Sequence, residues 1–100
     1  PMQGITMLRE VLDADPENEL AIYNLGMLAI TSGQLERAKE RFDKLRELNP
    51  ENPEANFYLG YCLFELGNTK ESEPYFRKVL ELDAGSVLVN GAEEYLGRIN

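Results

Sequence analysis

The chain contains no histidine and no tryptophan, and Cys62 is its only cysteine. A single cysteine excludes a disulfide within the chain, and without histidine the usual histidine–cysteine zinc sites are excluded as well. A cysteine nucleophile would also lack an imidazole to activate it. We therefore expect Cys62 to be a buried, inert thiol, which favours a reducing cytoplasm but is also compatible with a periplasmic or membrane-tethered parent protein.

Basic residues are scarce, because 10 lysines and arginines stand against 18 acidic residues and leave a net charge of −8. Such a chain repels phosphate backbones and anionic lipid, so we expect neither nucleic acid nor a membrane surface as partner. Apolar runs are too short for direct membrane insertion, and residues 1–4 do not resemble a signal peptide. The sequence has no Gly-rich phosphate loop and no pair of catalytic carboxylates, so we expect no cofactor, no metal and no enzymatic activity.

What the chain does contain is an internal repeat, within a composition that is 43% hydrophobic. Leu25-Gly26 recurs 34 residues later as Leu59-Gly60. A period of this size is typical of stacked supersecondary units, and 100 residues suit one small domain. Further matches at the same spacing are Ala21 with Ala55, Gly33 with Gly67, Phe42 with Phe76, and Lys44 with Lys78.

Each repeat predicts two helices, because apolar residues recur three and four positions apart on either side of a glycine break. Residues 1–18 match the second half of a repeat, because Gly4, Leu8 and Val11 fall one period before Ala38 and two apolar positions that follow it. The last helix is out of register by three residues, and we expect it to cap the last repeat. The predicted units are 1–18, 19–52, 53–86 and 87–100, which gives six helices and no strand.

The recurring residues resemble the tetratricopeptide repeat over nearly the whole chain. The family's pattern has Leu-Gly, then alanine, phenylalanine and proline within one repeat, and it corresponds here to Leu25-Gly26, Ala38, Phe42 and Pro50. Ile22 and Asn56 stand where the family usually has an aromatic residue. The resemblance implies a right-handed α-solenoid of antiparallel helix pairs, in which small residues such as Gly26 and Gly60 allow paired helices to approach closely.

The resemblance also implies a concave groove that is lined by the first helix of each repeat and holds a partner's peptide or helix. Once the packing positions are set aside, the first helices keep a second apolar stripe at helical spacing. An aromatic trough of this kind suits an apolar segment. The stripe is Tyr23, Met27, Ile30, Phe57, Tyr58, Tyr61 and Phe64, and its polar or mixed rim is Leu20, Asn24, Thr31, Glu54 and Glu65.

Two interpretations of this stripe stay open. In one it binds a partner, and in the other about half of it thickens the core, with Ile30, Phe64 and one of Phe57 and Tyr58 as the structural members. Tetratricopeptide domains that grip a C-terminal carboxylate do so with basic and asparagine side chains, and this chain places Tyr23, Met27 and Tyr58 at such positions. We therefore expect an apolar ligand with neutral or basic flanks.

Self-association is the alternative function. The N-terminal helix, which lacks its partner, would leave an apolar strip around Gly4, Leu8 and Val11 open to a second copy. A homodimer could form through this strip or through the groove, as part of a larger assembly. The competing interpretation is that the missing helix lies upstream in a longer protein.

Overall fold

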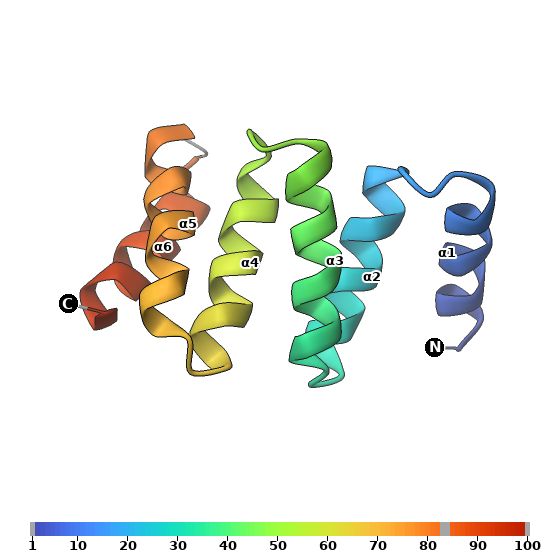
Figure 1. Cartoon of the computed structure of the whole chain (residues 1–100), viewed down its shortest axis with the longest axis horizontal. Helices are drawn as coiled ribbons and strands as arrows, with labels where there is room; N and C mark the ends of the chain where they lie inside the picture. Colours follow the sequence, from blue (N-terminus) through green and yellow to red (C-terminus); the bar gives the residue numbers. More distant parts are fainter. Residues whose placement is uncertain (1, 83–84, 100) are drawn as a thin grey trace.

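The computed structural model describes residues 2–82 and 85–99, and this part of the chain forms six helices and no strand. The helices stand side by side in chain order, as Figure 1 shows, and span 41 × 24 × 20 Å. The expected all-α solenoid is thereby confirmed. The helices are α1 (Met2–Ala14), α2 (Glu19–Thr31), α3 (Leu35–Leu48), α4 (Pro53–Glu65), α5 (Thr69–Leu82) and α6 (Ser86–Ile99).

The first helices of the two repeats begin in the same way. The side chain of Asn18 accepts a hydrogen bond from the Ala21 amide at 2.9 Å, and that of Asn52 accepts one from the Ala55 amide at 3.1 Å. Each asparagine satisfies one of the backbone donors that a helix start leaves unpaired. The repeat in sequence therefore reproduces the same local structure at both helix starts.

The same helices also end alike. Gly33 and Gly67 follow them with φ of +75° and +92°, a conformation that residues with a Cβ rarely adopt. The next amides, of Gln34 and Asn68, then reach back to carbonyls of the helix at 2.8 Å in both repeats. This left-handed ending turns the chain sharply into the second helix of each pair, as the glycine break predicts.

Close contact between paired helices depends on glycine opposite phenylalanine. A Cβ at Gly26 would lie 2.7 Å from the Phe42 ring, and one at Gly60 would lie 3.1 Å from the Phe76 ring. Both phenylalanines are fully buried. The contact at Gly26 therefore requires a residue without a Cβ, whereas the contact at Gly60 is tight and only favours one.

The last helix is displaced by three residues relative to the repeat, and its aromatic contacts show this directly. The rings form two equivalent sets, which are Tyr23, Phe42 and Tyr58, and Phe57, Phe76 and Tyr95. Tyr58 stacks on the buried Phe42 at 5.3 Å, and Tyr95 stacks on the buried Phe76 at 4.9 Å. Tyr23 and Phe57 meet the other two rings of their sets edge-on. Tyr95 follows Phe57 in the sequence by three residues more than Tyr58 follows Tyr23.

Pro74 lies inside α5, at its sixth residue. A proline there cannot donate the backbone hydrogen bond to the carbonyl four residues earlier, so α5 has one bond fewer than an uninterrupted helix. Its side chain is exposed.

In the part of the chain that the structure describes, no helix combines the length and the hydropathy that a membrane crossing requires.

Candidate functional site

The predicted stripe lies on the face formed by α2 and α4, which we call the first-helix face. A hollow on this face joins the two repeats, because Leu20 and Tyr23 line it from α2 and Glu54 lines it from α4. All seven stripe side chains are half-buried. Each therefore contributes to packing and still presents surface to solvent.

The rings of this face pair across the repeats with an offset of one residue. Because the stripe residues of α2 and α4 have the same spacing, the sequence predicts that Tyr23 lies beside Phe57. In the structure Tyr23 instead contacts the ring of Tyr58 in α4, edge-on and at 6.2 Å between ring centres. The stacking of Tyr58 on the buried Phe42 explains this, because it draws the Tyr58 ring toward α3 and α2. Phe57 instead turns toward α6.

Phe57 and Phe64 pack against the last helix. Their rings lie 6.2 and 5.0 Å from that of Tyr95, and a Cβ at Gly91 would come within 2.9 Å of Phe57. Both phenylalanines belong to the core between α5 and α6. Phe57 and Tyr58 each pack on a buried phenylalanine, and both stay half-buried.

The rim of the first-helix face is polar except for one residue. Leu20 is 69% exposed beside the hollow, so its side chain is free to cover a ligand. Thr31 is exposed, and its hydroxyl donates to the Met27 carbonyl at 3.0 Å. The remaining rim residues are Asn24 and Glu54, which are half-buried, and Glu65, which is exposed.

Charge on the first-helix face has a single sign. Neither α2 nor α4 contains lysine or arginine, and their only charged residues are Glu19, Glu54 and Glu65. Burial raises the pKa of Tyr58 and of Tyr61. At Tyr58 the neighbouring Tyr23 and then Glu54 raise the pKa further, and at Tyr61 Glu65 does so, which means that both hydroxyls stay protonated at neutral pH. The face therefore offers apolar rings, neutral hydroxyls and negative charge.

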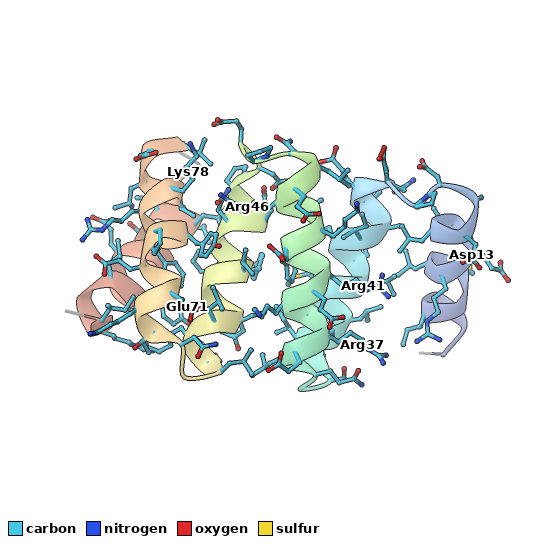
Figure 2. All side chains as sticks on the ribbon, in the orientation of Figure 1. Asp13, Arg37, Arg41, Arg46, Glu71 and Lys78 are labelled. Carbon is cyan, nitrogen blue, oxygen red and sulfur yellow. The ribbon has the colours of Figure 1, made fainter. Side chains whose placement is uncertain are left out.

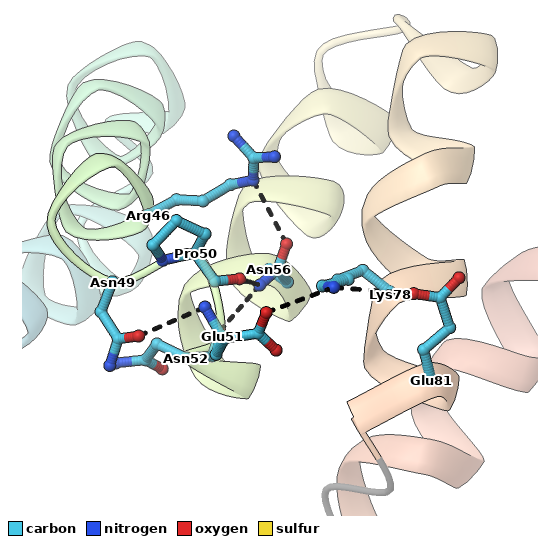
Figure 3. Close-up of polar contacts among 8 residues, drawn as sticks. All are labelled: Arg46, Asn49, Pro50, Glu51, Asn52, Asn56, Lys78 and Glu81. Carbon is cyan, nitrogen blue, oxygen red and sulfur yellow. Dashed lines mark hydrogen bonds and ion pairs between the residues drawn. The ribbon is translucent and has the colours of Figure 1, made fainter.

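A buried asparagine holds α4 in place behind this face. Asn56 is fully buried, and its side-chain amide donates to the carbonyls of Pro50 and Asn52 at 3.0 and 2.9 Å (Figure 3). Its carbonyl accepts a 3.3 Å bond from Nε of Arg46, whose guanidinium lies over the Tyr75 ring. In the sequence, Asn56 stands out only as a departure from the usual aromatic, and these tertiary bonds to α3 and its loop explain why asparagine fits there.

Cys62 is fully buried in α4, as expected. Burial raises its pKa to about 11, so the reactive thiolate is nearly absent at neutral pH. Among the residues that the structure describes, no three histidine, cysteine or acidic side chains gather as metal ligands.

The residues expected to self-associate lie along α1. Gly4 has open space around it, although Ala38, one period later, is fully buried. Val11 is 40% exposed and Leu8 is half-buried. Met7, which the repeat pattern does not single out, is 66% exposed.

Three solved structures illustrate what this fold resembles. The first tetratricopeptide domain of Spaghetti (RPAP3), bound to the HSP90 peptide SRMEEVD, has a TM-score of 0.84 at 23% identity, covering 95% of this chain and 73% of that one. The Sgt2 tetratricopeptide domain from Aspergillus fumigatus has a TM-score of 0.83 at 22% identity, covering 95% of this chain and 65% of that one. MamA has a TM-score of 0.75 at 25% identity, covering 80% of this chain. The chain spans 47% of MamA, about half its length.

A comparison with curated proteins finds no match. The tetratricopeptide repeat family matches residues 23–87, which is more than half of the chain. This protein therefore belongs to the tetratricopeptide repeat family.

Proposed function

We propose that the chain is a non-catalytic interaction module whose first-helix face binds an apolar segment of a partner protein, flanked by neutral or basic residues. The observation that carries this proposal is the combination of half-buried rings with acidic residues only on α2 and α4. Apolar side chains of a ligand would cover Tyr23, Met27 and Tyr61, and its basic residues would meet Glu54 and Glu65.

The related Spaghetti domain binds the peptide SRMEEVD, which is rich in carboxylates. Neither α2 nor α4 supplies a cation to pair with such a ligand. We therefore expect SRMEEVD to bind more weakly than a lysine-bearing apolar peptide.

The test is a fluorescence anisotropy titration with fluorescein-labelled GSKLLKKLL and SRMEEVD. We expect the lysine peptide to bind and the double variant Glu54→Lys/Glu65→Lys to weaken it at least tenfold, which corresponds to about 1.4 kcal/mol. Glu36→Lys/Glu47→Lys, which makes the same charge change at exposed positions of α3, serves as the matched control. Equal weakening by both double variants would mean that only net charge matters, and the proposal would then be wrong.

The apolar part of the proposal needs its own variant. Tyr61→Ala removes a half-buried ring without adding charge, and we expect about a tenfold loss of affinity for GSKLLKKLL with helicity retained. Circular dichroism at 222 nm checks the helicity. An affinity within twofold of the wild type would place the binding surface elsewhere.

Self-association through α1 is a second candidate, supported by the exposure of Gly4, Met7 and Val11. In α6, at the opposite end of the solenoid, Gly97 lies three residues beyond the position one repeat after Gly60, and it also has open space around it. In a head-to-tail contact, α6 of one copy would meet α1 of the next, as the first and second helix of a shared repeat.

Light-scattering mass over a range of concentrations tests this second candidate. We expect the mass to rise with concentration and Val11→Glu, at an exposed position, to abolish the rise. A monomer at every concentration would rule out this interface.

A further inference from the structure

A second cleft lies away from the first-helix face, between α1, α2 and α3. Its volume is about 240 Å³. Its floor is apolar, with Leu25, Leu28 and Ala29 from α2 and Ile5 from α1. Leu28 is half-buried, so part of this floor faces the open space.

Three arginines surround this apolar floor, Arg9 from α1 and Arg37 and Arg41 from α3. Figure 2 shows Arg37 and Arg41 extending from α3 toward α1. Asp13 and Glu40 line an adjoining hollow together with the same three arginines. These arginines are in none of the ion pairs found among the described residues, whose cations are Arg77, Lys78 and Arg98. Three of the ten basic residues of an acidic chain thus converge on one cleft without a carboxylate partner inside it.

Two positions that line this cleft hold packed side chains one repeat later. Tyr75 stands one period after Arg41 and packs against the buried core, and Cys62 stands one period after Leu28 and is fully buried. At these two positions the second repeat therefore has packed side chains, where the first repeat has an arginine and a half-buried leucine beside the cleft.

We propose that this cleft binds an acidic segment of a partner protein, whose aliphatic side chain enters the cavity while its carboxylates pair with Arg9, Arg37 and Arg41. A guanidinium offers a planar, paired set of donors that matches a carboxylate, and such charge-assisted bonds are among the strongest in proteins. A simple anion would leave the apolar floor of the cleft unused.

This inference is independent of the first-helix face, because the two sites prefer opposite charge. A lysine peptide should choose the face with Glu54 and Glu65, and a glutamate peptide of the same pattern should choose the cleft. A matched pair of peptides therefore separates the two proposals in one protein.

The experiment is an anisotropy titration at low ionic strength with fluorescein-labelled GSELLEELL, alongside GSKLLKKLL. We expect Arg37→Gln/Arg41→Gln to weaken the glutamate peptide at least tenfold and to leave the lysine peptide no weaker than before. Lys70→Gln/Arg77→Gln removes the same charge from exposed positions of α5 and should change glutamate-peptide binding less than threefold.

Two further reagents test the apolar floor. The peptide GSEGGEEGG keeps the carboxylates and lacks the leucines, so we expect it to bind at least tenfold more weakly than GSELLEELL. Leu28→Phe partly fills the cavity without changing charge and should also weaken GSELLEELL. Equal affinity of the two glutamate peptides would show a site for anions only and would overturn the proposal.

Two other results would also overturn it. One is an absence of GSELLEELL binding while the wild-type chain remains folded by circular dichroism. The other is binding that survives Arg37→Gln/Arg41→Gln and is lost in Tyr61→Ala, because the peptide would then occupy the first-helix face. Failure of GSKLLKKLL alone would count against the proposed function and leave the cleft unaffected.

Discussion

Substituting Gly26 by alanine tests the packing of the repeat, because the new Cβ would lie 2.7 Å from the Phe42 ring. Ordinary contact needs 3.4 Å, so the ring or the helix must withdraw by about 0.7 Å. Phe42 has little room to do so, since it is fully buried between Tyr23 and Tyr58. Overpacking of this kind costs about 1–3 kcal/mol, while alanine regains about 1 kcal/mol of helix propensity.

Because the buried Phe42 ring has little room, we expect a cost in the upper half of that range, so Gly26→Ala should lower the free energy of unfolding by about 1–2 kcal/mol, or the melting temperature by about 4–8 °C for each kcal/mol. Gly60→Ala, with 3.1 Å to the Phe76 ring, should be close to neutral. The new Cβ of Gly97→Ala meets nothing within 4 Å, so this variant, in the last turn of α6, should be neutral or more stable by a few tenths of a kcal/mol.

The assay is urea unfolding followed by circular dichroism at 222 nm for the three alanine variants and the wild type. We expect stability to rise in the order Gly26→Ala, Gly60→Ala, Gly97→Ala. Equal stability of all three variants, or a Gly26→Ala protein as stable as the wild type, would show that the glycine–phenylalanine contact does not limit the packing.

Three further predictions concern single residues. Asn56→Ala leaves two backbone carbonyls without their donor and should cost about 2–4 kcal/mol in urea unfolding; a loss below about 1 kcal/mol would show that these bonds contribute little. Pro74→Ala restores a helical N–H at an exposed position of α5 and should raise the free energy of unfolding by about 1–2 kcal/mol, whereas an unchanged melting temperature would contradict this. Since the pKa of Cys62 is raised from 9.0 to about 11, its thiol should react with Ellman's reagent at pH 8 about 100-fold more slowly in the folded chain than in guanidinium, and comparable rates would contradict its burial.

The helices and their order are predictable from the sequence, because they depend on local signals that occur twice. Gly33 and Gly67 end helices in both repeats, and Asn52 caps the helix that Pro53 begins. The three-residue displacement of the last helix is also visible in the sequence. Its ring contacts through Tyr95 need the structure, since they depend on which side chain reaches Phe76.

The site is predictable only in part, because side-chain direction depends on neighbours that lie far away in sequence. The stripe residues are half-buried as a group, yet the pairing of Tyr23 with Tyr58 follows from the stacking of Tyr58 on Phe42. The role of Asn56 depends on Arg46 and on carbonyls of the preceding loop. The arginine cleft depends on the placement of α1, which no local pattern specifies.

The most direct test of the proposed function is a ¹⁵N–¹H NMR titration of the labelled chain with unlabelled GSKLLKKLL. We expect the largest amide shifts on α2 and α4, around Tyr23, Met27 and Tyr61, while the arginine-bearing face of α3 stays unchanged. Shifts centred on α1 and α3, with α2 and α4 unaffected around those residues, would show that the first-helix face is not the binding surface.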